Sequence, residues 1–185
     1  MTATSLGSGP EFDRIRAIIA ALGPRASALG NDVGWISLDG THLAISTDVS
    51  VEGVHFRREW LTLEEIGWRA AATALSDLAA AGASAIGVVA AVTVPAGEEA
   101  ATTTRLMQGV DAAVASVGGS VLGGDLSRGA VISLAVTVVG SAERRMTRAG
   151  AMPGDGLWVT GTLGGAAAAL AAWTAGRDPA PAARA

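Results

Sequence analysis

Three aspartates stand where a folded chain could present carboxylates to a ligand. Asp32 lies in a Gly-rich turn, and Asp48 and Asp125 each follow an apolar segment that we predict to be a strand. A carboxylate at the end of a strand stands where a sheet often displays its ligands. The chain has no lysine to pair with them, which favours Mg²⁺, a cation that takes oxygen ligands and keeps waters and phosphate oxygens around it. The competing interpretation, in which each Asp only bonds its own turn, stays open because spacing alone does not show that the carboxylates converge.

Asp77 is placed differently, late in an amphipathic segment that we predict to be a helix. The helix macrodipole disfavours an anion there by about 0.3–1 kcal/mol. Its neighbours on the same face include Ala70, Ala74 and Leu78, so we expect a largely buried charge that needs a cation. The alternative is a local hydrogen bond to Thr73 or to solvent.

Two further features suit phosphate. Gly123 and Gly124, predicted to form a turn with Asp125, would let the backbone approach a bulky anion closely. Arg148 could clamp a phosphate through two parallel hydrogen bonds. An ordinary tight turn and a solvated loop arginine are the alternatives.

Composition excludes several other chemistries. The 185 residues are half apolar and 16% charged, which is typical of a globular protein, and the net charge of −4 argues against a nucleic-acid-binding face. The absence of Cys and Lys excludes disulfides, thiolate chemistry, a lysine Schiff base and a P-loop lysine. With only two histidines, a His-rich transition-metal site is excluded too.

The elements that must position these residues follow from hydrophobic period, caps and turns. Ser8 with Glu11 and Thr62 with Glu65 have the spacing of capping boxes, and Asp39-Gly40 predicts a hairpin. We predict helices over 12–22, 62–81, 98–117 and 164–175, and strands over 35–38, 43–47, 86–94, 120–122, 131–139 and 157–160. This order indicates an α+β fold, with a mixed or mostly antiparallel sheet and helices on one face. The other face needs a cover, which a dimer partner would supply.

The domain organisation is expected to be a flexible tail over 1–9, one main domain over 10–162, and the start of a second domain with an Ala/Pro tail over 163–185. The uncharged stretches 78–97 and 156–176 have the length of a membrane span, but Gly, Ser and Thr dilute both. Because the first residues also lack the pattern of a signal peptide, we expect a cytoplasmic protein that does not enter a membrane.

In their order along the chain, these segments resemble the family of thiamine-monophosphate kinases, from about residue 30 to about residue 170. The most specific stretches are Ser-Thr-Asp at 46–48 followed by Val-Glu-Gly-Val-His-Phe at 51–56, and Leu-Ser-Asp-Leu-Ala-Ala-Ala-Gly at 75–82. The resemblance implies the fold of the N-terminal domain shared with aminoimidazole ribonucleotide synthetase, with the C-terminal domain absent. It also implies a homodimer in which sheet faces join.

The resemblance also implies roles. ATP would transfer its γ-phosphoryl group directly to thiamine phosphate, assisted by Mg²⁺ and without a protein nucleophile. Nucleotide contacts would come from Gly124, Asp125 and Arg148, and His55 would contact the substrate, whereas His42 matches nothing and is expected at the surface. The positions that match magnesium ligands are Asp32, Ser46, Thr47, Asp48, Asp77 and Asp125.

Two residues depart from the family's pattern. Asn31 replaces the first of two consecutive aspartates, and Leu126 replaces a threonine. Together with the missing second half, these departures leave alternatives open. The first is a non-catalytic nucleotide-binding domain of the same fold, the second is another ATP-dependent synthetase of the superfamily, and the third is a purely structural dimerisation module.

Overall fold

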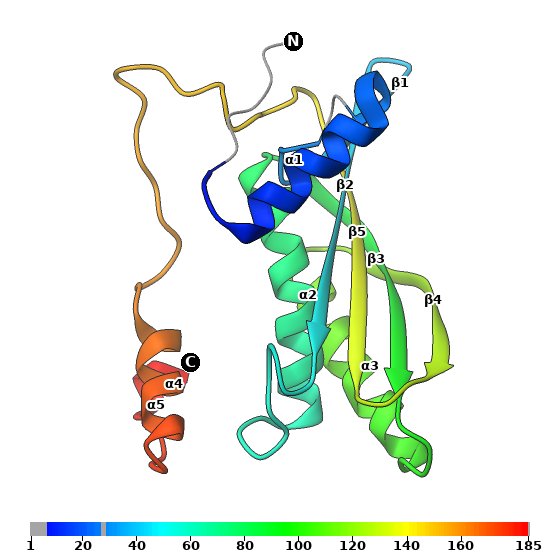
Figure 1. The fold of residues 1–185 in the computed structure, drawn as a ribbon, viewed down its shortest axis with the longest axis vertical. Helices are drawn as coiled ribbons and strands as arrows, with labels where there is room; N and C mark the ends of the chain where they lie inside the picture. The colour runs from blue at the N-terminus through cyan, green and yellow to red at the C-terminus, as the bar shows by residue number, and fades with distance from the viewer. Residues whose placement is uncertain (1–6, 27–28, 185) are drawn as a thin grey trace. The chain divides into compact units, whose positions relative to one another are not determined.

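The computed structural model describes residues 7–26 and 29–184. The chain divides into two compact units, and the boundary along the sequence lies between Gly150 and Ala151. The first unit contains the sheet and most of the helices (Figure 1). Its elements are α1 (Pro10–Leu22), η1 (Gly23–Ala26), β1 (Gly34–Leu38), β2 (Thr41–Val51), α2 (Leu63–Ala80), β3 (Ser84–Val94), α3 (Ala100–Ala115), β4 (Ser120–Arg128) and β5 (Ser133–Ala142). The second unit holds α4 (Gly165–Thr174) and α5 (Pro181–Arg184).

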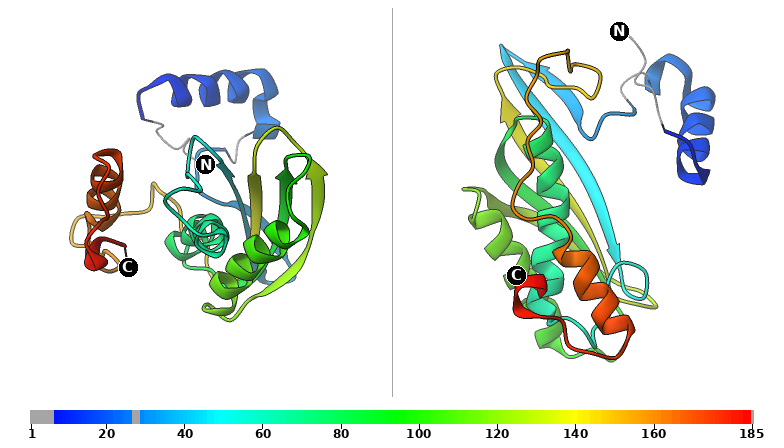
Figure 2. Two further views of the ribbon diagram at one scale, coloured as in Figure 1. Left: turned by 90° about the horizontal axis from the view of Figure 1, so that it is seen from below. Right: turned by 90° about the vertical axis from the view of Figure 1, so that its left-hand side faces the viewer.

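The five strands form one mixed sheet in the order β1-β2-β5-β3-β4. Neighbouring strands are antiparallel except β3 and β4, which are parallel and are joined through α3. Helices α2 and α3 lie on the same face of the sheet (Figure 2). No helix among residues 7–26 and 29–150 contacts the opposite face. The predicted α+β architecture with helices on one face is therefore confirmed.

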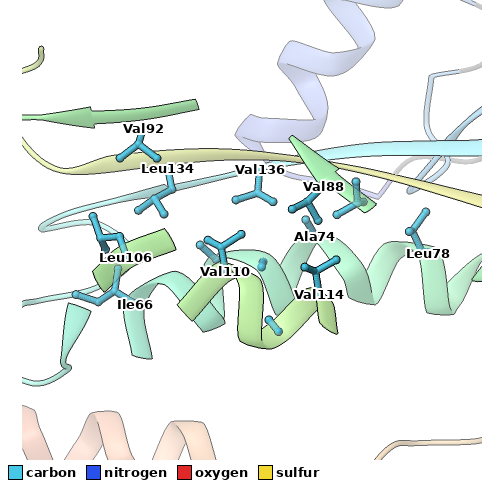
Figure 3. Close-up of a cluster of buried hydrophobic side chains, with 14 of the residues drawn as sticks. Ile66, Ala74, Leu78, Val88, Val92, Leu106, Val110, Val114, Leu134 and Val136 are labelled. Atoms are coloured by element: carbon cyan, nitrogen blue, oxygen red, sulfur yellow. The ribbon is translucent and has the colours of Figure 1, made fainter. Parts of the chain in front are cut away.

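The core lies between this sheet and the two helices (Figure 3). Alternate residues of β5 point toward the helices, where Leu134, Val136 and Val138 are fully buried. Because strand side chains alternate between faces, the residues between them form the open face. The two helices cross at a backbone-to-backbone contact, since a Cβ on Gly67 would lie 1.9 Å from the carbonyl oxygen of Leu106.

Local signals located several turns correctly. Asp39 and Gly40 join β1 to β2 with φ angles of 41° and 86°, as the hairpin signal predicts. The capping box of Thr62 and Glu65 at the start of α2 is confirmed. The capping box at Ser8 is wrong, because Gly9 caps α1 without a side-chain hydrogen bond.

Strand extents differ from prediction in three places. β2 continues to Val51, so Asp48 lies inside the strand rather than closing it. β4 runs through residues 123–125, where a turn was predicted, because these residues pair with β3. The strand predicted over 157–160 does not form among the described residues, since it has no neighbour to complete its hydrogen bonds.

The ends of the chain add three findings. The helix predicted over 164–175 is confirmed as α4, and the tail after it contains the short helix α5. Residues 1–6 of the predicted N-terminal tail lie outside the described residues. None of the described helices is both long enough and apolar enough to cross a membrane.

Candidate active site

The centre of the candidate site is a hydrogen bond between β2 and α2. The Ser46 hydroxyl donates to Asp77 Oδ2 over 2.6 Å. Ser46 is buried because alternate residues of β2 face the helices, and Asp77 lies one turn before the end of α2. The alternative partner, Thr73, is wrong, since its hydroxyl donates to the carbonyl oxygen of Arg69 over 2.9 Å.

The surroundings of Asp77 disfavour the ionised form of its carboxyl group. Burial is the main cause that raises the pKa of its carboxyl, and the nearby charges of Asp48 and Asp32 raise it further. The hydrogen bond from Ser46 and the charge of Arg148 act in the opposite direction. Two predicted metal ligands, Asp48 and Asp32, are thus close enough to Asp77 to disfavour its charge, as expected of carboxylates that share a cation.

Asp32 and Arg148 form a two-pronged ion pair. Arg148 donates a hydrogen bond from Nε to Asp32 Oδ2 over 3.2 Å, and its Nη2 lies 2.9 Å from Asp32 Oδ1. The pair joins a predicted metal ligand to a predicted phosphate contact, and both side chains remain partly exposed. Asp32 can therefore leave Arg148 to bind a cation, and Arg148 can leave Asp32 to bind an anion such as a phosphate.

Two of the predicted metal ligands, Thr47 and Asp125, lie on the open face of the sheet. Across the sheet, Asp48 of β2 lies opposite Val136 of β5, which lies opposite Ala90 of β3, which lies opposite Gly124 of β4. These four residues form one row, and their side-chain positions are on the same face. Asp125 is one residue beyond this row, so its side chain points to the face opposite Asp48. The distance along the row is about 14 Å, at about 4.8 Å per strand. The structure does not bring Asp125 to Asp48.

Hydrogen bonds on the open face engage both residues. The Thr47 hydroxyl lies 2.5 Å from that of Thr137 on β5, and the two share a hydrogen bond. Asp125 accepts a hydrogen bond from Ser127 over 2.9 Å. The predicted set thus divides, with Asp32, Ser46, Asp48 and Asp77 on the helix side.

The helix-side set fits a hard cation in its chemistry. Its donors are carboxylate and hydroxyl oxygens, and a cation would neutralise the charges of Asp48 and Asp32, which add to burial in raising the pKa of Asp77. As the side chains stand, no group of three His, Asp or Glu residues among residues 7–26 and 29–184 could hold a metal ion alone. Mg²⁺ that keeps waters and phosphate oxygens needs fewer protein ligands.

The two glycines before Asp125 differ in their surroundings. A Cβ on Gly124 would lie 2.1 Å from the carbonyl oxygen of Ala90, so the parallel pairing of β3 and β4 requires a glycine there. A Cβ on Gly123 would meet nothing within 4 Å. Of the two, Gly123 alone leaves open space beside its backbone for a bulky anion.

His55 lies beside Asp48 in an open pocket of about 210 Å³ between β2, α2 and the loop after β2. Its Nδ1 accepts a hydrogen bond from the Val51 amide over 3.1 Å, which leaves Nε2 as the ring's donor. The His55 amide donates in turn to the Val51 carbonyl over 2.8 Å. Gly53 takes a φ of 80° in this loop, and Phe56 is buried beneath it.

An ion-pair network holds the loop that carries His55. Arg58 donates to Glu52 over 2.7 Å and to Glu98 over 2.8 Å. Hydrogen bonds to both carboxylates raise the pKa of Arg58. Glu52 also accepts the amide of Ile132 over 3.1 Å, so the loop is tied to the start of β5.

Sequence reasoning missed Arg69, which lines the same pocket as Asp48 and His55. A signal was available, because Arg69, Thr73 and Asp77 repeat at intervals of four and lie along one side of α2. His42, expected at the surface, is instead half-buried: its Nδ1 lies 3.1 Å from the hydroxyl of Ser37 and its ring meets Trp35 edge-on.

Comparison with known proteins gives consistent results. The family model described as "AIR synthase related protein, N-terminal domain" matches residues 30–142. A thiamine-monophosphate kinase of Synechococcus elongatus is 40% identical over 127 residues, which cover 68% of this chain and 39% of that protein. This confirms the resemblance to thiamine-monophosphate kinases.

Solved structures share the fold at similar coverage. A structure described as "AaThiL complexed with AMPPCP and TMP" has a TM-score of 0.85 and 30% identity, and the match covers 96% of this chain and 58% of that one. Thiamine monophosphate kinase from Aquifex aeolicus has a TM-score of 0.80 at 30% identity, with 92% and 56% covered. The chain thus spans only part of the length of these relatives.

Proposed function

We propose, on the premise that this chain belongs to the family of AIR synthase related proteins, that it forms the ATP- and magnesium-binding half of a thiamine-monophosphate kinase. The observation that carries the proposal is the convergence of Asp32, Asp48 and Asp77 beside the pocket that His55 lines. AMPPCP, an analogue of ATP, and TMP occupy the similar structure described above, which supports the same two ligands here.

The reaction is a direct phosphoryl transfer. An oxygen of the acceptor phosphate bonds to the γ-phosphorus of ATP while the bond from that phosphorus to the β,γ-bridging oxygen breaks, giving thiamine diphosphate and ADP. The acceptor oxygen is already ionised near neutral pH, so no protein nucleophile is needed. Because both reactants are anions, the main barrier is charge repulsion, and the protein's task is positioning and charge neutralisation.

The residues divide this task. Asp32, Ser46, Asp48 and Asp77 would hold Mg²⁺, which would supply positive charge to neutralise the phosphates. Arg148 would exchange Asp32 for a nucleotide phosphate, and His55 would contact thiamine phosphate. Gly124 and Asp125 remain proposed nucleotide contacts, while Thr47 and Asp125 remain predicted metal ligands from the open face.

The first test is magnesium-dependent binding of AMPPCP to this chain, measured by calorimetry. We expect Asp48→Asn and Asp77→Asn each to abolish it, while Asp111→Asn, at an exposed position on α3, leaves it intact. Binding that persists in both site variants would refute the assignment.

A second candidate is a nucleotide-binding domain without catalysis, favoured by Asn31, which stands where the family's pattern has a carboxylate. Incubation with Mg·ATP and thiamine phosphate separates the two. Thiamine diphosphate formed by the wild type and lost in Asp48→Asn establishes the kinase, whereas binding without turnover establishes the second candidate.

We also propose that two copies of the chain pair through the open face of the sheet. The apolar residues of this face include Leu43, Ile45, Val49, Val89, Ala91, Ala135 and Val139. Burial of this face against a second copy would remove its apolar area from water. Each Å² of apolar area buried stabilises the dimer by about 25 cal/mol.

A further inference from the structure

Arg69 stands in the pocket beside His55 without an ion-pair partner among the described residues. Its side chain is exposed, and its backbone carbonyl accepts a hydrogen bond from Thr73. Arg148, Arg58 and Arg105 each pair with a carboxylate. An arginine that lines a pocket beside a carboxylate without pairing to it is available to an anionic ligand.

The geometry of α2 and β2 orders the site along a line. Asp77 and Arg69 are eight residues apart on one side of α2, about 12 Å at 1.5 Å per residue. On β2, Ser46, Asp48 and Ser50 face the helix at successive alternate positions. Ser46 contacts Asp77 at one end, and Ser50 lines the pocket with Arg69 at the other.

The charges along this line have opposite signs at its two ends. The carboxylate of Asp77 lies at one end, where we propose that a cation binds, and Asp48 lies between this end and the pocket, which it also lines. At the other end Arg69 supplies a fixed positive charge to the pocket that His55 lines, and Ser50 and Thr73 add hydroxyl groups. A ligand with a phosphate fits between them, with one side of the phosphate toward the cation and the other toward Arg69.

We infer that Arg69 binds the phosphate of the acceptor substrate and so makes the pocket select a phosphorylated ligand over its alcohol. This inference rests on the proposed function. Arg69 holds the acceptor phosphate beside Asp48 while His55 contacts the rest of the molecule. Its guanidinium, charged at any working pH, offsets the negative charge that accumulates when two phosphates meet.

The test is calorimetric binding of thiamine phosphate and of thiamine to the chain and to Arg69→Met, Arg69→Lys and Arg14→Met. We expect Arg69→Met to weaken thiamine phosphate binding about tenfold or more and to leave thiamine binding unchanged. Arg69→Lys should restore part of the preference because it keeps the charge. Arg14→Met, a matched change on the exposed surface of α1, should have no effect.

Three results would overturn the inference. These are unchanged thiamine phosphate binding in Arg69→Met, an equal loss for both ligands, and a wild-type chain that does not prefer thiamine phosphate to thiamine. Magnesium-dependent AMPPCP binding, measured in parallel, distinguishes failure of this inference about Arg69 from failure of the proposed function. If AMPPCP binding is retained while the phosphate preference does not depend on Arg69, only this inference fails. If AMPPCP binding fails in the wild type, the proposed function fails.

Discussion

Asp77 is the side chain on which the electrostatics of the site converge. Its carboxyl is partly buried, accepts a hydrogen bond from Ser46, and is close to two other carboxylates. Its raised pKa means that the ionised form is disfavoured in the folded protein. Ionisation of Asp77 therefore costs stability at pH values above the ordinary carboxyl pKa of 3.8, and the cost disappears below it.

Replacing Asp77 by asparagine should therefore stabilise the metal-free protein. The amide side chain would keep an oxygen to accept from Ser46 and lose the charge, so Tm should rise at neutral pH. The difference should shrink as the pH falls toward 3.8. Thermal unfolding in chelator-treated buffer across this range measures it, with Asp111→Asn as the control. A lower Tm for the variant at neutral pH would contradict the account.

Gly123 and Gly124 should respond differently to replacement by alanine. Gly124→Ala places a methyl group 2.1 Å from a carbonyl oxygen of β3, so we expect a loss of about 1–3 kcal/mol in the free energy of unfolding. Gly123→Ala has open space and should fold normally. If the backbone at 123 approaches a phosphate, this change should weaken AMPPCP binding. Denaturant unfolding and calorimetry distinguish these effects, and equal destabilisation by both changes would refute the distinction.

At the scale of elements, the contact between α2 and α3 is set by two glycines and an ion pair. A Cβ on Gly109 would lie 2.0 Å from the carbonyl oxygen of Glu64, in the same way that Gly67 meets Leu106. At the surface, Arg105 donates to Glu64 over 2.6 and 2.9 Å and lowers the pKa of Glu64 to about 2. Exposed ion pairs contribute little, so close packing is the larger effect.

Gly67→Ala and Gly109→Ala should each destabilise the protein by about 3 kcal/mol. Alanine normally stabilises a helix relative to glycine by about 0.5–1 kcal/mol, but here the added methyl group would force the helices apart. Gln108→Ala, at an exposed position on α3, is the matched control and should change little. Urea unfolding measures all three variants. A glycine variant as stable as the wild type would show that the helices can separate without cost.

Elements governed by local chemistry could be predicted from the sequence, and those governed by distant partners could not. The hairpin at Asp39-Gly40 and the cap at Thr62 depend on residues that are adjacent or three apart. The length of β4 depends on its pairing with β3, which the sequence does not display. A glycine pair that looks like a turn in isolation becomes strand when a neighbour supplies its hydrogen bonds.

The same reason limits prediction of the site. Asp32, Asp48, Asp77 and the loop of His55 were found by motif, and the structure gathers them. The opposite orientation of Asp125 follows from strand register, which is a nonlocal property. Arg69 belongs to no motif, and its spacing from Asp77 along α2 points to the site only once Asp77 is taken as part of it.

At the scale of the whole molecule, the open face of the sheet leaves apolar side chains exposed to water. Val49 and Val89 are 48% and 39% exposed on it, and Thr47 and Thr137 form a polar pair among its apolar side chains. The edge strand β1 is short and ends in a tight hairpin. Pairing through the open face would bury these apolar side chains, which pairing through β1 would leave exposed.

We expect the chain to sediment as a dimer and Val89→Lys to convert it to a monomer, because the charge would be buried without a partner. The dimer dissociation constant should rise about tenfold or more. Val117→Lys, at a 52% exposed position that follows α3, should leave the dimer intact. A monomeric wild type, or a dimer that tolerates Val89→Lys, would contradict the proposed pairing.

The alternation along β2 has a consequence for how this domain can change during evolution. Ser46 and Asp48 face the helices, whereas Thr47 and Val49 face the opposite side. Insertion or deletion of one residue within the strand would exchange the two sets, so that the carboxylate would point to the open face and apolar groups would point toward the helices. Lineages can therefore vary these side chains by substitution, but length changes must be confined to the connecting loops.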